Sequence, residues 1–204
     1  MIRIGVIGGI GSGKSFVAKL FNYPVFNADN EVKHLYKNSK ECFKKLKKKL
    51  PKYIKKFPVR KRDLILAIHE DKNNLNKISS VVQPLVRKRM YSFIKKNKKR
   101  KIIILDIPLL IENKLNNKND VIIFVKSKKD KVLSRLKKRR AYNKKLLKYL
   151  RENQIMLSKK RKLANYIVDN NFSQNIMKKN INLLKNKILN ERSSTWYRDN
   201  WPFG

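Results

Sequence analysis

The sequence predicts an α/β fold in which one five-stranded parallel sheet has helices packed on both of its faces. Five short segments are rich in Ile and Val, and longer stretches with the helical spacing of apolar residues separate them. Continuous apolar strands are typical of parallel sheets that are buried on both faces. A chain of 204 residues is long enough for one such domain with small insertions.

The expected strands begin at the N-terminus and recur along the chain. In order, they are residues 2–7, 24–27, 102–106, 121–125 and 166–170. Asp29 follows the second strand closely, and Asp106 is the last residue of the third. Ligands of open α/β sheets bind beyond the carboxyl ends of the strands. We therefore expect acidic side chains at the edge of the sheet that binds a ligand.

The expected helices fill the gaps between these strands. They are residues 16–21, 64–72, 78–96, 130–140, 144–163 and 175–190. Residues 30–100 are too many for a simple crossover between two strands, so we expect them to form a helical insert.

These elements predict a single domain over residues 1–190. Its core is expected to comprise residues 1–29, 101–138 and 164–190, with the helical insert at 30–100. The cation-rich residues 139–163 are expected to form a mobile lid over the site. Residues 191–204 form a C-terminal tail, because the composition shifts there to aromatic and polar residues.

Nearly all the glycine of this chain lies in one nine-residue window. Five of its six glycines are Gly5, Gly8, Gly9, Gly11 and Gly13. Residues 8–15 match the pattern G-x-x-x-x-G-K-[ST], in which backbone N–H groups cradle the phosphates of a nucleotide. The motif follows an expected strand and leads into an expected helix, which is the setting that it requires. The sequence therefore predicts a P-loop.

The residues of this loop have expected roles in nucleotide binding. The Lys14 ammonium would reach the β- and γ-phosphate oxygens, and the Ser15 hydroxyl would bind Mg²⁺. Contacts with the nucleotide are expected from Gly9, Ile10, Gly11, Ser12, Gly13, Lys14, Ser15 and Phe16.

Two further features point from nucleotide binding to phosphoryl transfer. Asp29 follows the strand expected beside the first one, so its carboxylate should face the γ-phosphate. Arg135, Arg139 and Arg140 cluster on or just beyond one helix, where they could close over the phosphates and stabilise the charge of the transition state. A phosphate loop, an acid and an arginine lid are the parts of a small-molecule kinase.

Several motifs together resemble the dephospho-CoA kinase family. They are Gly8-Gly9-Ile10-Gly11-Ser12-Gly13-Lys14-Ser15, Asn27-Ala28-Asp29, Asp106-Ile107-Pro108-Leu109-Leu110-Ile111-Glu112, Gln154, and Val168-Asp169-Asn170-Asn171. The likeness runs from about residue 2 to about residue 180 and keeps the order of these motifs. The P-loop is common to many kinases, whereas the Pro-Leu-Leu-x-Glu block and the early acid are more specific to this family.

The resemblance implies a transferase with a P-loop kinase-like, three-layer fold, a helical substrate-binding insert and a lid. The implied reaction is the ATP-dependent phosphorylation of the ribose 3′-hydroxyl of dephospho-CoA, which gives CoA in the last step of CoA biosynthesis. The implied partners are therefore two small molecules, ATP and dephospho-CoA, with Mg²⁺ as the metal.

The resemblance also implies roles for individual residues. Asp29 would act as the general base or orient the acceptor hydroxyl, and Arg139 would join Lys14 in meeting the phosphates. Asp106 would hold Mg²⁺ together with Ser15. Contacts with the acceptor are implied for Asp29, Pro108, Leu109, Leu110 and Glu112. Asn170 and Asn171 would lie near adenine.

The chain departs from the family pattern at several positions. Phe16 stands where threonine is usual, and Asn27 replaces the first of two acids. Gln83 replaces the histidine of a His-Pro pair, and Lys61 stands where arginine is expected. Asn165 replaces an aspartate, and the glycine expected after Asn171 is missing. These differences affect the expected contacts with dephospho-CoA more than the residues expected to carry out phosphoryl transfer.

The chain carries 53 Lys and Arg residues against 14 Asp and Glu residues, which gives a net charge of +39. Nucleic-acid binding would explain such a charge, but the cations are spread over nearly every segment and accompany no recognisable nucleic-acid module. We therefore favour a drift in composition and expect no nucleic-acid partner. In either case the positive field attracts anionic substrates such as ATP.

Two alternatives to the favoured function stay open at this stage. One is another nucleoside or nucleotide kinase on the same fold, and the other is a basic nucleic-acid-binding protein that uses ATP only as a regulatory ligand. Cys42 is the only cysteine, and the first strand starts next to Met1 with no signal peptide or membrane span evident. We therefore expect a cytoplasmic protein, and a monomer.

Overall fold

The computed structural model describes residues 1–137 and 154–193. The chain divides into two compact units. One comprises Met1–Phe26 with Lys99–Gly204, and the other comprises Asn27–Lys98. Within the described ranges, no helix is both long and apolar enough to span a membrane.

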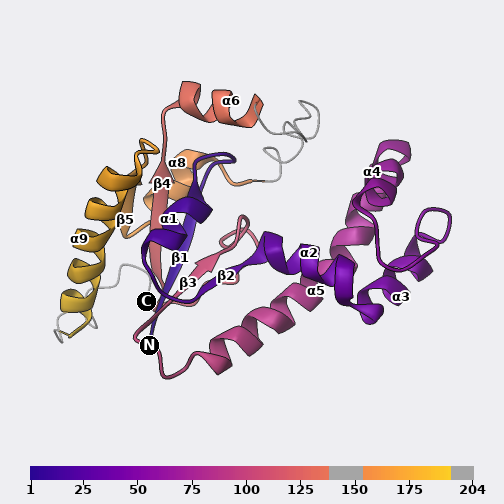
Figure 1. The fold of residues 1–204 in the computed structure, drawn as a ribbon, viewed down its shortest axis with the longest axis horizontal. Coiled ribbons are helices and arrows are strands. Elements are labelled where there is room, and N and C mark those ends of the chain that lie inside the picture. The colour runs from indigo at the N-terminus through magenta and orange to yellow at the C-terminus, as the bar shows by residue number, and fades with distance from the viewer. Residues whose placement is uncertain (138–153, 194–204) are drawn as a thin grey trace. The chain divides into compact units, whose positions relative to one another are not determined.

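The first unit is built on a five-stranded parallel sheet (Figure 1). Its strands are β1 (Ile2–Gly8), β2 (Val25–Asn27), β3 (Ile102–Asp106), β4 (Val121–Lys126) and β5 (Tyr166–Asp169), in the spatial order β2-β3-β1-β4-β5. The central strand β1 pairs in parallel on both sides, so that Ile4 lies opposite Ile104 of β3 and Val121 of β4. The predicted strands and the parallel sheet are confirmed, with ends that differ by at most one residue. The expectation that the strand before Asp29 lies beside the first strand is wrong, because β3 lies between β2 and β1.

One face of the sheet is covered by two helices that lie side by side, α1 (Lys14–Leu20) and α9 (Gln174–Ser193) (Figure 1). Fully buried residues of β1, such as Ile4 and Val6, share a core cluster with Phe21, the C-cap of α1, and with Met177 of α9. The apolar runs of the sequence thus form this interior, as their composition predicted.

The opposite face of β1 packs against the segment that follows β3. Leu110 is fully buried there, and a Cβ atom added to Gly5 would overlap its side chain. Helix α8 (Leu157–Lys162) also contacts β1, and α6 (Lys129–Lys137) follows β4. Gly5 is therefore needed for the close approach of this segment to the central strand.

The helix expected over residues 144–163 is confirmed at Leu157–Lys162 and wrong for residues 154–156. Residues 154–156 are not helical, and α8 begins only at Leu157. The Ile155 N–H donates to the Glu112 carboxylate, 3.1 Å away, and Met156 has an extended backbone as the N-cap of α8. A long-range polar contact therefore interrupts a segment whose composition favours a helix. Residues 144–153 lie outside the described residues.

The second unit, Asn27–Lys98, is helical. It contains α2 (Ala28–Asn38), α3 (Lys40–Lys49), α4 (Lys61–Glu70) and α5 (Asn73–Lys96). The Asn27 side chain accepts the Asn30 N–H, and the Ser39 hydroxyl accepts the Cys42 N–H, so that both side chains cap helix N-termini. A separate core cluster, which includes Leu35, Cys42, Leu46, Ala67 and Ile78, holds this unit together.

Candidate active site

The glycine loop connects β1 to α1 through residues 9–13. The Ser12 N–H donates to the Gly9 carbonyl at 3.2 Å, which closes the loop on itself. Gly13 precedes α1 in the left-handed region, with φ of 87° and ψ of 24°. A Cβ atom at Gly13 would overlap the amide nitrogen of Asn170. Glycine is thus required here by both the backbone angles and the space.

The Lys14 side chain bends back over the start of this loop. Its ammonium donates to the carbonyl oxygens of Gly8, at 3.2 Å, and Gly9, at 2.9 Å, and the residue is 9% exposed. The positive charge is thereby held beside the loop that the sequence identified as a phosphate site. Ser15, the next residue, is exposed.

The loop is held from outside by two residues at the carboxyl ends of neighbouring strands. The Ser12 carbonyl accepts hydrogen bonds from Asn170 Nδ2 and from Ser127 Oγ, each at 2.8 Å. Asn170 directly follows β5 and is 3% exposed. The family resemblance implied a place near adenine for Asn170, and neither bond to the loop was predicted.

Asp106 ends β3, the strand beside β1. Gly5 pairs with Leu105, so Asp106 lies one residue further toward the glycine loop. The residue is 2% exposed. Among residues 1–137 and 154–193, no three or more His, Cys, Asp or Glu side chains gather into a metal site. Asp106 therefore lies on the strand next to β1, at the end of that strand that is nearer to the glycine loop.

The Pro-Leu-Leu-x-Glu block forms turns after β3. Pro108 and Leu109 are partly exposed, whereas Leu110 is fully buried against Gly5. The Glu112 carboxylate lies 2.6 Å from the Lys160 ammonium, and Lys160 also lies 3.5 Å from the Pro108 carbonyl. Two of the residues expected at the substrate therefore contact the protein itself. The sequence offered no sign of Lys160, which stands in a run of four cations.

The two remaining expected catalytic residues lie elsewhere in the chain. Asp29 belongs to the unit Asn27–Lys98, where it is exposed in the first turn of α2. Arg139 lies outside the described residues, as does Arg140. Their roles stay predictions.

Arg135 of the expected arginine cluster stacks on an aromatic ring. Its guanidinium carbon lies 4.3 Å from the centre of the Phe172 ring, a cation–π geometry. Phe172 has a positive φ of 66° and follows Asn171, where the family pattern has glycine. The phenylalanine thus keeps a backbone conformation that glycine adopts more easily. The side chain of Phe16, another expected contact, packs against the core.

Residues 117–120 read Asn-Lys-Asn-Asp and match the N-K-x-D pattern with which GTPases read guanine. This tetrapeptide precedes β4, at the opposite end of the strand from the glycine loop. Asp120 is 1% exposed and accepts hydrogen bonds from Arg3 Nη2 at 3.0 Å and from the Asn117 N–H at 2.9 Å. The match therefore forms a structural turn.

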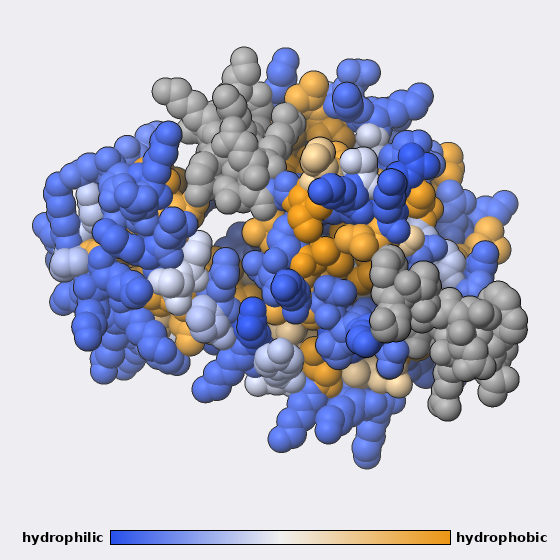
Figure 2. Space-filling model, turned by 180° about the vertical axis from the view of Figure 1, so that it is seen from behind, coloured by the Kyte–Doolittle hydropathy of each residue, from blue (hydrophilic) through white to orange (hydrophobic). Residues whose placement is uncertain are grey.

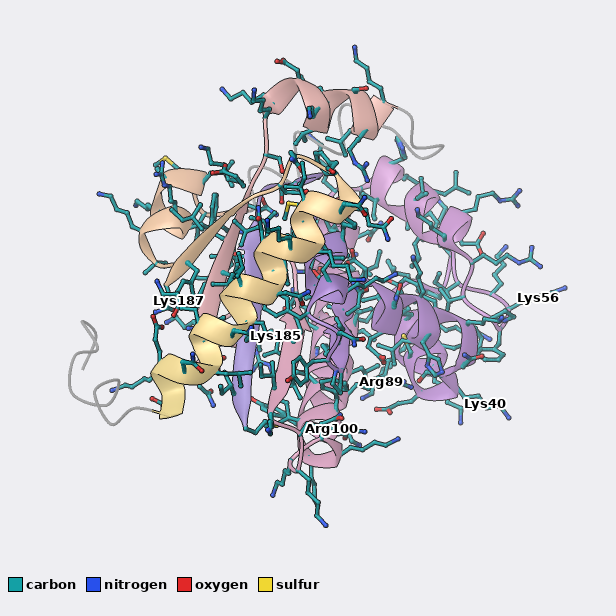
Figure 3. All side chains as sticks on the ribbon, turned by 60° about the vertical axis from the view of Figure 1, so that its left-hand side comes forward. Lys40, Lys56, Arg89, Arg100, Lys185 and Lys187 are labelled. Carbon is teal, nitrogen blue, oxygen red and sulfur yellow. The ribbon has the colours of Figure 1, made fainter. Side chains whose placement is uncertain are left out.

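Positive charge is spread over both units. The labelled cations in Figure 3 belong to α3, the loop after it, α5, the segment before β3, and α9. Figure 2 shows hydrophilic residues around the outline of one face and hydrophobic ones mainly inside it. Within the helical unit, a groove of about 620 Å³ along α5 includes Arg87, Lys88, Tyr91 and Lys95. This groove offers positive charge to an anionic ligand.

Comparisons with known proteins agree on one family. The family model of dephospho-CoA kinase matches residues 2–175. The dephospho-CoA kinase of Wolbachia pipientis wMel is 33% identical over 176 residues, which cover 84% of this chain and 90% of that protein. The dephospho-CoA kinase of Bartonella quintana is 31% identical over 193 residues, which cover 90% and 98% of the two chains.

Solved structures show the same fold. The crystal structure of TT1252 from Thermus thermophilus superposes with a TM-score of 0.73 at 25% identity, covering 93% of this chain and 97% of that one. Dephospho-CoA kinase from Campylobacter jejuni gives 0.65 at 20% identity, covering 93% and 98%. Shikimate kinase from Acinetobacter baumannii gives 0.52 at 15% identity, covering 95% and 96%. The last two similarities concern the fold alone, which is that of P-loop kinases.

Proposed function

This chain belongs to the dephospho-CoA kinase family, and from that premise we propose how its residues carry out the reaction. The enzyme phosphorylates the ribose 3′-hydroxyl of dephospho-CoA with ATP, which completes CoA biosynthesis. The observation that carries this function is the family match over residues 2–175, a range that includes the P-loop and the Pro-Leu-Leu-x-Glu block.

The phosphates of ATP bind at residues 9–16, with their oxygens facing the backbone N–H groups of the loop. The Lys14 ammonium, which donates to the Gly8 and Gly9 carbonyls, supports this assignment because it already lies beside the loop. A P-loop lysine of this kind meets the β- and γ-phosphate oxygens. We assign it to the charge that builds up on the transferred group.

In the transfer step, the 3′-oxygen of dephospho-CoA forms a bond to the γ-phosphorus. The bond from that phosphorus to the β–γ bridging oxygen breaks, and ADP leaves with its electron pair. Asp29 orients the attacking hydroxyl and accepts its proton. An ordinary carboxylate is ionised at neutral pH, and in a loose transition state positioning matters more than basicity. Arg139 would add positive charge at the phosphates.

The oxygen ligands that Mg²⁺ prefers are present beside the loop. Mg²⁺ is usually held by one or two protein oxygen ligands together with substrate phosphates and water. The Ser15 hydroxyl and the Asp106 carboxylate, which ends the strand next to β1, fit that need. When bound, the metal neutralises phosphate charge and aligns the β- and γ-phosphates.

The acceptor side of the site combines direct contacts with residues that act through packing. We assign Pro108 and Leu109, which are partly exposed, to contact with dephospho-CoA. Leu110 and Glu112 hold these turns in place, through Gly5 and Lys160 respectively.

A coupled assay of ADP release tests this function. The purified protein should release ADP with dephospho-CoA as acceptor, and mass spectrometry should find the added phosphate on the ribose 3′-oxygen. Transfer to nucleosides or nucleoside monophosphates, with none to dephospho-CoA, would favour another kinase of this fold. Salt-dependent RNA binding without turnover would favour the nucleic-acid-binding alternative.

We further propose that the enzyme acts in the cytoplasm as a monomer without a nucleic-acid partner. A lone cysteine supports a reducing compartment. The dispersal of the labelled cations in Figure 3 supports small anions, and not a polyanion, as ligands. Cell fractionation and light scattering would test location and oligomeric state.

A further inference from the structure

We propose that Asn170 is a positioning residue that orients the phosphate loop through the Ser12 carbonyl. This inference rests on the proposed nucleotide site at residues 9–16 and assigns Asn170 to the loop instead of the base. Three segments meet at this point: the glycine loop, the residues after β4 with Ser127, and the turn after β5 with Asn170 and Phe172.

The orientation of the Asn170 amide follows from its partners. Its oxygen accepts the Phe172 N–H at 2.9 Å, and a backbone N–H can only donate. The nitrogen must then face the Ser12 carbonyl, to which it donates at 2.8 Å. The Asn170 N–H itself donates to the Lys126 carbonyl at 2.8 Å, which ties the residue to the end of β4. Asn170 is therefore fixed at both its backbone and its side chain.

The Ser12 carbonyl receives two donors, Asn170 Nδ2 and Ser127 Oγ. A carbonyl oxygen has two lone pairs, so these bonds use its full capacity. A trans peptide is planar, and its C=O and N–H point in opposite directions. Holding the Ser12 oxygen toward Asn170 and Ser127 therefore turns the Gly13 N–H away from them. In a phosphate loop, such N–H groups bind the anion.

Packing links the same residues. A Cβ atom at Gly13 would overlap Asn170 Nδ2 and would lie 2.9 Å from Cε1 of Phe172. The turn after β5 thus lies directly against the last residue of the loop. Contact of this kind leaves the Ser12–Gly13 peptide little freedom to rotate.

The alternative role for Asn170 is a direct contact with adenine. Its amide nitrogen and oxygen are both already bonded to the protein, and the residue is 3% exposed. A base would have to reach the remaining N–H or lone pair of a side chain that is almost fully buried. The two roles predict different losses when Asn170 is replaced. A positioning role weakens binding of the phosphates, whereas a base contact weakens binding of adenosine.

Competition against labelled ATP, with inorganic tripolyphosphate and adenosine as probes, separates the two roles. In Asn170→Ala, the affinities for ATP and tripolyphosphate should fall about tenfold or more, as expected when a buried acceptor loses its donor. The affinity for adenosine should stay unchanged. Ser127→Ala should give a smaller loss, because Asn170 still holds the carbonyl.

Two more variants separate the loss of the bond to Ser12 from a general loss of folding. Asn170→Asp keeps the acceptor for the Phe172 N–H but loses the donor to Ser12, so it should show the same loss for tripolyphosphate. Asn175→Ala is the matched control, since this residue also carries an amide side chain but is exposed near the start of α9. Each variant is first checked for native thermal unfolding.

The outcomes distinguish this inference from the proposed function. Wild-type affinity for tripolyphosphate in both Asn170 variants, or a loss confined to adenosine, would overturn the positioning role. A wild-type protein that binds tripolyphosphate but transfers no phosphate to dephospho-CoA would overturn the function and leave the positioning role intact. A wild-type protein that binds neither ATP nor tripolyphosphate would overturn both.

Discussion

The Lys160 ammonium lies 2.6 Å from the Glu112 carboxylate, with the Lys160 side chain fully buried and that of Glu112 only 11% exposed. This ion pair joins the helix α8 to the turns after β3. The same carboxylate oxygen accepts the Ile155 N–H, two residues before α8 begins. Breaking such a pair leaves a buried charge without its partner, which costs more than the pair itself contributes.

Lys160→Met should therefore lower the free energy of unfolding by about 3–5 kcal/mol, measured by urea denaturation. The double variant with Glu112→Gln should recover part of this loss, because no unpaired charge is then buried. Lys159→Met, at an exposed neighbouring lysine, is the control and should change the free energy of unfolding little. Equal effects of the Lys159 and Lys160 variants would contradict a buried ion pair.

Gly13→Ala should damage nucleotide binding more than Gly9→Ala. The new methyl group at Gly13 would overlap Asn170 and require a left-handed backbone, whereas a Cβ atom at Gly9 would meet Leu157 at 3.4 Å, an ordinary contact. A left-handed backbone of this kind costs ~1–3 kcal/mol in a residue other than glycine. We therefore expect kcat/KM for ATP to fall roughly tenfold or more in Gly13→Ala. Steady-state kinetics at a fixed concentration of dephospho-CoA would measure kcat/KM for ATP in both variants. Equal losses in Gly13→Ala and Gly9→Ala would contradict this prediction.

Lys14→Ala should reduce kcat by roughly 10²–10³-fold, the effect of removing one preorganised charge from a transition state. Lys19→Ala, at an exposed lysine of the same helix, should retain normal turnover. Near-normal turnover in Lys14→Ala would refute its assignment to the phosphates.

Asp29→Asn should lower kcat by about 10²–10⁴-fold, the range for a positioned general base. The affinity for ATP, measured by calorimetry, should stay unchanged because Asp29 is assigned to the acceptor. Asp63→Asn provides a control, since Asp63 also lies in the first turn of a helix of the same unit. Loss of ATP binding in Asp29→Asn would instead make Asp29 a metal ligand or a structural residue.

Burial raises the pKa of the Cys42 thiol to about 11, and the nearby Glu41 charge adds to the shift. An unfolded cysteine titrates at about 8.5. The thiol therefore contributes stability that is fully present below about pH 8.5 and is lost as the pH rises to about 11. Urea denaturation from pH 7 to pH 10 should show a steeper loss of stability in the wild type than in Cys42→Ala. Identical slopes would argue against the raised pKa.

Local patterns were sufficient to predict the strands and the phosphate loop. Buried parallel strands need continuous apolar residues, and the P-loop needs glycine, lysine and serine at a set spacing, so both leave a signature within a few residues. The departure from glycine after Asn171 was also visible in the sequence, although its consequence, the positive φ of Phe172 beneath Arg135, was not.

Contacts between distant residues could not be predicted in this way. Asn170 and Ser12 are 158 positions apart, and only the order of the strands brings them together. Lys160 stands among four consecutive cations that look alike in sequence, and only the packing of α8 buries this one beside Glu112.

The sequence by itself thus determined the class of fold, the position of the glycine loop and the family of this protein, because those features depend on residue type and local spacing. The tertiary structure decided which residues hold the glycine loop and which of the expected substrate residues contact the protein instead. Such roles depend on which side chains meet across strands and turns, and that is set by the whole packed chain.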